Sequence, residues 1–481
     1  MAKHANPRLL ITTLIFVTAM MAVISSLGAP LINTVAVANK ISLSTAEWTL
    51  TAALLTSAIA TPIMGRLADG PRQRRVVLVG LSIVIIGLII AALSKDFKWL
   101  LVGRSLQGVG MGLAPVTMAI ARNQLDIPMS ARTIGTLSVT SSACVGLGYS
   151  ATSLIAEKYN YHASFWCASL LVMISFVVAW AVIPKFTNQE KRSFDLAGAI
   201  LLTFSLIGIL AVLGEGEIWG WTSPLSISVG ACGIVLAIFW VIYSLRKKDA
   251  LVNLHLSSSR GVVAVNITGF LISISMFMFV PVIVEFVQIP KRTGLGFGSS
   301  ILTSGLLLVP LSITTLGSSK LIPFVLKYLS SRIIIPLGCS VFALASLYFA
   351  IQHSSLWQAF ATIGIAGVGI GFTFGAMPGY IVRSVPDGET GNALGLFQLV
   401  RSIGLSIGSA VAGTLLAHYT FRNQSFPSLK GFTTVLYVGS GMLGIAAITS
   451  YFLLGTTNGE SSPTKDELEL MKESAGISGL A

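Results

Sequence analysis

The sequence predicts an all-α protein that crosses a membrane fourteen times. Hydrophobic residues make up 54% of its 481 residues and charged residues only 10%, whereas a soluble protein carries about a quarter charged residues. The apolar residues are gathered in runs of about 20, the length that an α-helix needs to cross the hydrocarbon of a bilayer. We therefore expect a polytopic membrane protein without a sizeable soluble domain.

We place the spans from these apolar runs. Their expected ranges are 9–37, 48–65, 75–94, 99–121, 133–156, 162–184, 195–214, 225–245, 262–287, 299–319, 330–350, 355–380, 390–417 and 431–454. The first run follows Lys3 and Arg8 as a secretory signal would, but it is too long and lacks a clear cleavage site. We therefore interpret it as an uncleaved first helix.

The orientation follows from a basic loop between the second and third spans. This loop contains Arg66, Arg72, Arg74 and Arg75, which cannot lie in hydrocarbon. Most other lysines and arginines between spans fall on the same face, and the positive-inside rule makes that face cytoplasmic. Because the number of spans is even, we expect a protein of the cytoplasmic membrane with both termini in the cytoplasm.

An internal repeat divides the chain. The glycine-rich stretch 107–112 recurs at 366–371, and 122–126 is echoed by 383–387, an offset of about 260 residues. We expect two six-helix halves of the same orientation, which need an even number of helices between them. The expected divisions are 1–190 for the first half, 191–254 for an inserted helix pair, 255–456 for the second half and 457–481 for a polar cytoplasmic tail.

Two stretches carry a resemblance to a known family. Residues 65–75, Gly-Arg-Leu-Ala-Asp-Gly-Pro-Arg-Gln-Arg-Arg, resemble the helix 2–3 signature of the major facilitator superfamily. The inserted pair begins Asp-Leu-Ala-Gly at 195–198 and turns at Trp-Gly-Trp-Thr-Ser-Pro, 219–224. It resembles the extra helix pair of the fourteen-helix drug:proton antiporter family.

The resemblance implies a secondary transporter for multidrug efflux, of the kind that gives antibiotic resistance. Such a protein exports lipophilic or amphipathic compounds by alternating access, in exchange for protons, and binds its substrate between the two halves. The implied partners are a small-molecule substrate, protons and the lipid bilayer. We expect a monomer without a cofactor.

The chain departs from that family in two spans. Where the family usually has an aspartate in the first span, residues 24–30 read Ile-Ser-Ser-Leu-Gly-Ala-Pro and hold no acid. The antiporter motif G-x-x-x-G-P of the fifth span appears at 146–151 without its proline. The family's proton route therefore cannot be carried over whole, although the glycines still permit close helix packing.

The basic loop supplies candidate gating residues. These are Gly65, Asp69, Arg72, Arg74 and Arg75. A carboxylate at the end of the second span can accept bonds from the arginines after it and from a neighbouring helix N-terminus. We expect this cluster to hold the two halves together in one state and to release them in the other. The alternative is plain positive-inside topology.

Three residues are candidates for proton coupling. Arg104 lies in Arg-Ser-Leu-Gln-Gly, which resembles a family motif whose arginine is linked to proton transfer, and an arginine within hydrocarbon is costly unless it faces a cavity or partner. Glu285 is well inside a predicted span, where burial favours its protonated form. Glu47 lies at the outer end of the second span. The alternatives are a structural arginine that reaches the interface and an interfacial carboxylate.

A further set of polar or aromatic side chains in the spans is expected to line a substrate cavity. They are Ser26, Asn33, Gln107, Phe277, Gln398 and Arg401. Arg401 follows Phe-Gln-Leu-Val in a stretch resembling the family's F-Q-x-x-R-x-x-G, and it would meet an anionic or polar substrate group. Otherwise it is a buried structural arginine, and Phe277 is a packing or lipid contact.

Other functions find less support in the residues. The five histidines form no ligand pair, and the four cysteines lie at unrelated spacings in apolar segments, so we expect neither a metal site nor disulfides. The net charge of +13 is explained by the cytoplasmic loops, and no basic patch with interleaved aromatics suggests nucleic acid. No nucleophile–base arrangement indicates an enzyme.

Two alternatives stay open. One is an exporter of a single dedicated metabolite, natural product or lipid, without proton coupling. The other is a non-transporting receptor or scaffold, although the lack of a soluble signalling domain weighs against it.

Overall fold

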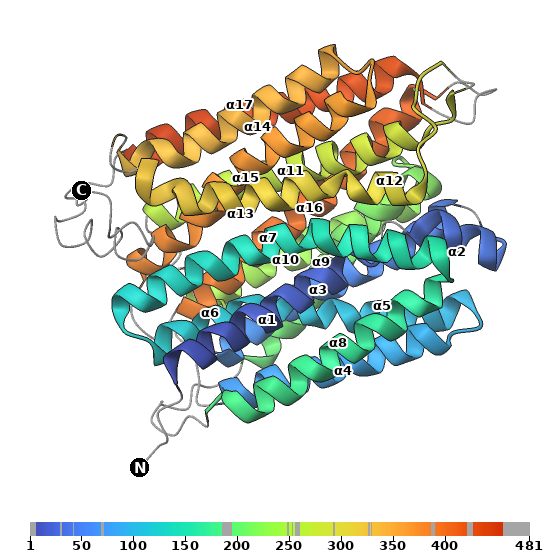
Figure 1. Cartoon of the computed structure of the whole chain (residues 1–481). Coiled ribbons are helices and arrows are strands. Elements are labelled where there is room, and N and C mark those ends of the chain that lie inside the picture. The colour runs from blue at the N-terminus through green and yellow to red at the C-terminus, as the bar shows by residue number, and fades with distance from the viewer. Residues whose placement is uncertain are drawn as a thin grey trace.

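The computed structural model describes residues 6–28, 31–41, 43–68, 72–184, 195–247, 250–252, 254, 260–291, 294–325, 328, 330–385, 390–420 and 427–455. Within these residues the chain is mainly helical, and the long helices run side by side along one elongated molecule (Figure 1). Thirteen helices in this part of the chain are long and apolar enough to cross a membrane. The expected all-α, multi-pass fold is confirmed.

The helices fall into three groups along the chain. The first bundle holds α1 (Pro7–Ser26), α2 (Ile32–Asn39), α3 (Leu43–Ala68), α4 (Gln73–Leu93), α5 (Phe97–Gly108), the 3-10 turn η2 (Val109–Gly112), α6 (Leu113–Gln124), α7 (Ile127–Lys158) and α8 (Tyr161–Val182). An inserted pair follows, α9 (Leu196–Trp219) and α10 (Pro224–Arg246). The second bundle holds α11 (Arg260–Gln288), α12 (Ile301–Leu306), α13 (Leu308–Val325), α14 (Ser331–Ile351), α15 (Leu356–Ser384), α16 (Thr390–His418) and α17 (Leu429–Gly455).

Three of the spans expected as single helices are interrupted. The span 9–37 is divided into α1 and α2, and the sequence between them contains Gly28 and Pro30, residue types that disfavour a helix interior. The span 99–121 is divided into α5 and α6, because the glycine-rich stretch between them tightens into the turn η2. The span 299–319 is divided into α12 and α13. The fourteenth crossing is thus α5, η2 and α6 together.

The first and last described helices define the two ends of the molecule. α1 begins and α17 ends at the same end, which we call the terminal end (Figure 1). The crossings alternate in direction, so α3 also ends there, next to the basic loop. The opposite end, where α2 and α12 lie, is called the far end.

Glycines of the repeated stretch have the same packing role in both bundles. A Cβ on Gly108 would lie 2.2 Å from the carbonyl oxygen of Ala53 in α3, and a Cβ on Gly367 would lie 2.6 Å from that of Leu311 in α13. No side chain fits at such distances, so both positions need glycine for the two helix backbones to touch. The repeat in the sequence is therefore also a repeat of helix packing.

The Asp-Leu-Ala-Gly stretch is a helix cap. Asp195 Oδ1 accepts a hydrogen bond from the Gly198 N–H at 3.0 Å, which satisfies one of the unpaired N–H groups at the start of α9. The same carboxylate forms an ion pair with Lys247 at 2.8 Å and accepts hydrogen bonds from the Tyr243 hydroxyl and the Leu251 N–H, both at 3.0 Å. It joins the start of α9 to the end of α10 and to the chain that follows.

These bonds set the charge of the pair. Burial raises the pKa of Asp195, but the hydrogen bonds from Lys247, Gly198, Leu251 and Tyr243 together lower it by a larger amount. The pKa of Asp195 therefore lies below its ordinary value. The hydrogen bond to Asp195 raises the pKa of Lys247. Both groups are therefore charged at neutral pH.

The turn between α9 and α10 explains the Trp-Gly-Trp-Thr-Ser-Pro stretch. Gly220 has a φ of +82°, a conformation that side chains disfavour. Ser223 caps α10 by accepting a hydrogen bond from an N–H of its first turn at 3.2 Å, and Pro224 is the first residue of α10. The Trp221 ring covers Gly216, where a Cβ would lie 2.7 Å from a ring carbon.

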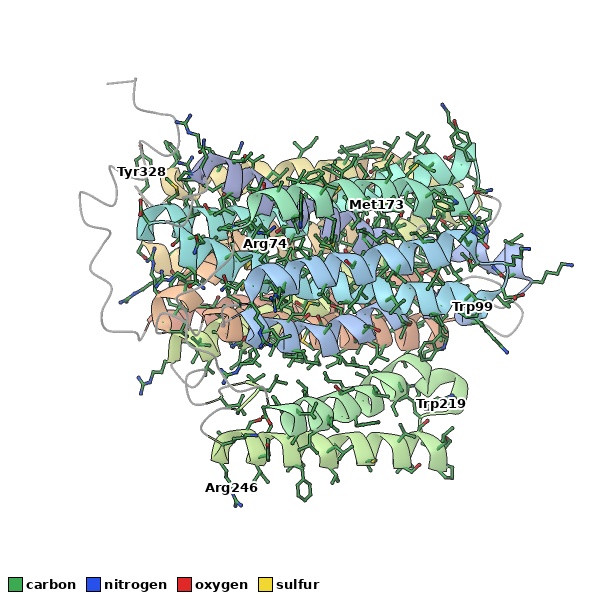
Figure 2. All side chains as sticks on the ribbon, turned by 90° about the horizontal axis from the view of Figure 1, so that it is seen from below. Arg74, Trp99, Met173, Trp219, Arg246 and Tyr328 are labelled. Carbon is green, nitrogen blue, oxygen red and sulfur yellow. The ribbon has the colours of Figure 1, made fainter. Side chains whose placement is uncertain are left out.

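The inserted pair lies along one side of the molecule. Figure 2 shows it between Trp219 and Arg246, beside the other helices. α9 contacts α3 of the first bundle and α16 of the second, and Leu206 belongs to a buried cluster with Ala58 and Leu399. α9 thus touches both bundles, whereas α10 packs on α9 from outside.

Candidate functional site

A narrow cleft lies between the two bundles. It is lined by Ala114, Pro115 and Met118 of α6, Ser138 and Ser141 of α7, Pro378 of α15, and Leu394, Phe397, Gln398 and Arg401 of α16. Its free volume is about 10 Å³, room for roughly one water molecule. The bundles are therefore closed around it in this structure. The guanidinium of Arg401 is the one charged group among these lining residues.

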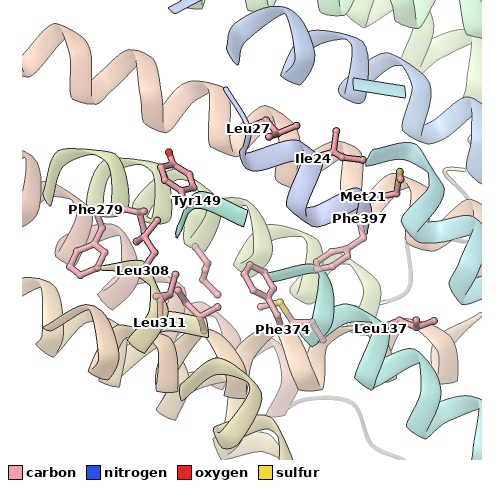
Figure 3. Packing of buried hydrophobic residues seen from close by; sticks show 14 of the residues in the cluster. Met21, Ile24, Leu27, Leu137, Tyr149, Phe279, Leu308, Leu311, Phe374 and Phe397 are labelled. Atoms are coloured by element: carbon pink, nitrogen blue, oxygen red, sulfur yellow. The ribbon is translucent and has the colours of Figure 1, made fainter. Parts of the chain in front are cut away.

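Arg401 is held by one polar and two aromatic contacts within the second bundle. Its Nη1 donates a hydrogen bond to Gln398 Oε1 at 3.0 Å, one helical turn earlier on α16. Its Cζ lies 4.0 Å from the ring centre of Phe374 and 5.7 Å from that of Phe397, both labelled in Figure 3. Its Nε is buried and has no hydrogen-bond partner. A guanidinium over an aromatic face is stabilised by a cation–π contact.

The local sequence fixes this geometry. Gln398 and Arg401 are three residues apart on α16 and so share a helix face. The Phe397 ring packs on Gly269 of α11, where a Cβ would lie 2.7 Å from a ring carbon. Phe374 belongs to α15, and its carbonyl oxygen accepts a hydrogen bond from Ser138 Oγ of α7 at 2.7 Å. The aromatic support of Arg401 is thus tied to the first bundle.

A second arginine inside the expected spans lies nearer the far end. Arg104 on α5 is fully buried. Its Nε donates to the Thr49 carbonyl oxygen at 2.9 Å, and its Nη1 donates to Gln107 Oε1 at 2.6 Å and lies 3.5 Å from the Ile24 carbonyl oxygen. Its Nη2 is buried without a partner, 2.7 Å from where a Cβ on Gly28 would stand. Arg104 therefore joins α1, α3 and α5 within one bundle.

The far end of the cleft is closed by α7. Ser150 Oγ donates to the Gly305 carbonyl oxygen at 2.7 Å, and Glu157 Oε2 accepts a hydrogen bond from the Leu302 N–H at 2.9 Å. Gly146 lies against α13, where a Cβ would be 2.6 Å from a backbone oxygen. Small residues along α7 thus allow close contact with the second bundle.

The expected gating residues are only partly described. Asp69 lies outside the described residues. Gly65 of α3 lies beside α16, with its Cα 3.5 Å from a Cβ built on Gly395. Arg74 Nη2 donates to the carbonyl oxygen of Trp180, at the end of α8, at 2.5 Å. Its contact is therefore within the first bundle.

The remaining two gating candidates, Arg72 and Arg75, have exposed side chains. They carry charge at the membrane surface, as the positive-inside pattern requires.

The expected burial of Glu285 is wrong. Its side chain is exposed, whereas the neighbouring Phe286 and Val287 are buried. It lies one turn before the end of α11, at the far end, and it is not among the hydrogen-bond partners of Arg104. The side chain of Glu47 lies outside what the structure describes.

The other expected cavity residues are dispersed. Ser26 is buried and its hydroxyl donates to the Val23 carbonyl oxygen at 2.6 Å, in the contact between α1 and α7. Gln107 accepts the bond from Arg104, and Phe277 is half-buried on α11. The side chain of Asn33 is outside the described part. Only Gln398 and Arg401 line the cleft.

Most residues that line the cleft were not foreseen from the sequence, and neither was Phe374, which supports Arg401. Phe374 has no sequence signal, because its role comes from the packing of α15 on α16. Ser138 could have been suspected only as one of many small residues on α7. No three histidine, cysteine, aspartate or glutamate side chains in the described residues gather as a metal site.

Comparison with known proteins agrees with this architecture. The sequence matches the profile of the Major Facilitator Superfamily over residues 11–326, 193–409 and 265–475. It is 25% identical over 419 residues to the "Putative multidrug resistance protein MdtD" of Escherichia coli O6:H1, covering 84% of this chain and 85% of that protein. The protein of the same name in Escherichia fergusonii is 26% identical with the same coverage.

A solved structure supports the fold independently. The crystal structure of the human organic anion transporter MFSD10 (TETRAN) matches with a TM-score of 0.63, covering 92% of this chain and 99% of that one. Its identity is 14%, so this likeness shows the fold alone. The family expected from the basic loop is confirmed: the chain belongs to the Major Facilitator Superfamily of membrane transporters.

Proposed function

We propose that this transporter exports lipophilic or amphipathic compounds across the cytoplasmic membrane by alternating access, with the substrate bound in the cleft beside Arg401. The observation that carries the proposal is a cleft between two bundles that contains one charged group on an aromatic support. The names of the curated relatives, which refer to multidrug resistance, agree with it. The terminal end would face the cytoplasm.

Alternating access requires the bundles to separate at one end while they stay in contact at the other. The contacts between them suit this motion. They run along α3 and α16 and along α7 and α12–α13, and glycines bring the backbones close at Gly65 and Gly395 and at Gly146. At these glycines no side chain interlocks the two helices, so the contact there can break without repacking.

We further propose that proton entry drives export, with Glu285 and Glu47 at the far end as the sites of protonation. The exposure of Glu285 near the end of α11 supports this role. Arg104 would act separately, since it contacts α1 beside the break at Gly28 rather than Glu285. A change in its partners would then alter the arrangement of α1 and α3.

Export itself is tested by drug susceptibility. A strain lacking its major efflux pumps, expressing the protein, is compared with an empty-vector strain across lipophilic cations, anions and neutral compounds. We expect a raised inhibitory concentration for at least one class, and its loss when a protonophore is added during an efflux assay. No protection and no energised efflux of any compound would refute the proposal.

Coupling is tested by Glu285→Gln. This variant keeps the shape of the side chain but cannot carry a proton, so we expect export to lose its dependence on pH. Unchanged export with unchanged pH dependence would exclude Glu285 as the coupling site.

The alternative is a dedicated exporter without proton coupling. One observation favours it: α1 carries no aspartate or glutamate, where the antiporter family usually has an acid. Purified protein in proteoliposomes distinguishes the two, because substrate-stimulated proton flux occurs only in an antiporter.

A further inference from the structure

The residues that line the cleft supply no counter-charge to Arg401. No aspartate or glutamate is among its lining residues, and the only hydrogen bond of Arg401 in the described structure is to the neutral amide of Gln398. A charged group away from water costs free energy unless it is paired. An unpaired arginine within a membrane span is therefore a functional feature by default.

The free donors of Arg401 have the geometry that an anion needs. Gln398 occupies Nη1, whereas Nε is left without a partner. The Nε–H belongs to the edge of the guanidinium that binds carboxylate, sulfonate or phosphate oxygens in a bidentate manner. Because the hydrogen bond to Gln398 uses Nη1, the edge of the guanidinium that carries the Nε–H has no partner from Gln398.

The surroundings of Arg401 fit an aromatic or apolar body next to the anion. Phe374 and Phe397 lie 4.0 and 5.7 Å from its Cζ, and Met118 and Leu394 line the same cleft. Flat rings and a methionine adapt to different apolar shapes. The charge of Arg401 would repel the positive group of a cationic drug at the same place.

We propose that the cleft takes amphipathic anions, with the acidic group on Arg401 and an aromatic or apolar body against Phe374 and Phe397, in preference to lipophilic cations. This rests on the proposed function, because it assumes that the cleft beside Arg401 is the substrate site. It goes further by assigning the charge class of the substrate.

Two dyes with the same ring system test it. Fluorescein is an anion and rhodamine 123 is a cation, and both are built on a xanthene. Uptake of each is measured in energised inside-out vesicles that contain the protein, and binding to purified protein is followed by fluorescence anisotropy. We expect energised uptake of fluorescein at least about 10-fold above that of rhodamine 123.

The arginine is then varied. Arg401→Gln should weaken fluorescein binding and raise its KM about 10-fold or more, and Arg401→Lys should recover part of the loss, since it keeps the charge but not the fork. Arg383→Gln is the matched control, because Arg383 is an exposed arginine on the neighbouring helix α15 and its loss should change uptake less than about 2-fold.

Gln398→Glu gives an independent test that keeps the arginine. The new carboxylate would pair with Arg401 at the distance of the present bond, 3.0 Å, so fluorescein uptake should fall and the preference should move toward rhodamine 123. This variant keeps the proposal falsifiable if Arg401→Gln does not reach the membrane.

The outcomes separate the two proposals. Uptake of rhodamine 123 without fluorescein, or fluorescein uptake that Arg401→Gln and Gln398→Glu leave unchanged, overturns the anion assignment while export stands. Uptake of neither dye, with no protection against any compound of the susceptibility screen, overturns the proposed function and the anion assignment with it.

Discussion

Replacing Gly305 by alanine should disfavour closure of the two bundles at the far end. Gly305 of α12 faces α7, and a Cβ there would lie 2.4 Å from Ser153 Oγ and 2.6 Å from Ser153 Cβ. The serine hydroxyl can rotate away, but the two Cβ atoms are fixed to their backbones. α7 and α12 must therefore move apart, which breaks the bond between Ser150 and the Gly305 carbonyl oxygen.

The size of the effect follows from the cost of overpacking. An extra methyl group in a closely packed contact costs about 1–3 kcal/mol. The penalty applies only to the state in which the far end is closed, so it changes the ratio of closed to open molecules. A difference of about 1–3 kcal/mol changes that ratio roughly 5- to 150-fold.

The assay is the labelling rate of a cysteine in the cleft. Ser141→Cys is introduced in a background whose four native cysteines are replaced, and the outside of intact cells is exposed to a membrane-impermeant maleimide. Gly305→Ala should increase the labelling rate several-fold and should slow dye export, because the protein remains open to the outside for longer.

The chain provides its own control. Gly317, in α13 of the same crossing, has no heavy atom within 4 Å of a built Cβ, so Gly317→Ala has the same helix propensity effect without the clash. The double variant Gly305→Ala with Ser153→Gly removes the opposing Cβ and should restore closure. Equal labelling and export in Gly305→Ala and Gly317→Ala would show that this contact is not an opening surface.

Two further predictions concern stability, both read by thermal unfolding of purified protein in detergent. Asp195→Asn removes the charged acceptor of Lys247 and should lower the unfolding temperature by weakening the inserted pair. Because the pKa of Asp195 is lowered in the folded protein, the stability that Asp195 contributes should be complete above the pKa of an unfolded aspartate, near 3.9. That stability should be lost as the pH falls through the pKa of Asp195 in the folded protein. Equal stability of the variant and the native protein at pH 7 would contradict this prediction. Gly408→Ala should lower stability by about 1–3 kcal/mol, since a Cβ would lie 2.3 Å from the Ile274 carbonyl oxygen. Gly413→Ala on the same helix, with nothing within 4 Å, is its control and should not be destabilised.

The features that could be predicted from the sequence are those that need a particular residue type. Gly108 and Gly367 appear in a recognisable repeat because only glycine lets two helix backbones touch there. Asp195 and Gly220 stand in recognisable motifs because a helix cap and a positive φ also restrict the residue. Membrane spans are visible because the bilayer requires long apolar runs.

The rest depended on contacts that leave no pattern in a single sequence. Arg104 is held mainly by backbone carbonyl oxygens, of Thr49 and Ile24, and any residue supplies a carbonyl. Phe374 meets Arg401 through the packing of two helices, which periodicity does not reveal. The exposure of Glu285 depends on the helix face, and residues 281–284 before it are apolar, so only Gln288, three residues later, indicated a polar face.

Arg104 and Arg401, the two arginines inside the expected spans, have different capacities for function. Both are paired with a glutamine three residues away on the same helix. The partners of Arg104 all belong to the first bundle, so a rigid movement of the bundles leaves its surroundings unchanged. Arg401 faces a cleft whose other wall is formed by α6 and α7, so the same movement changes its exposure to water. An anion bound to Arg401 offsets the cost of the unpaired charge only while the cleft is closed around it. Binding energy at that position therefore differs between the open and closed states, which is the condition for a ligand to shift the equilibrium. A ligand bond to Arg104 alone could not meet that condition without a change inside the first bundle, at the break between α1 and α2.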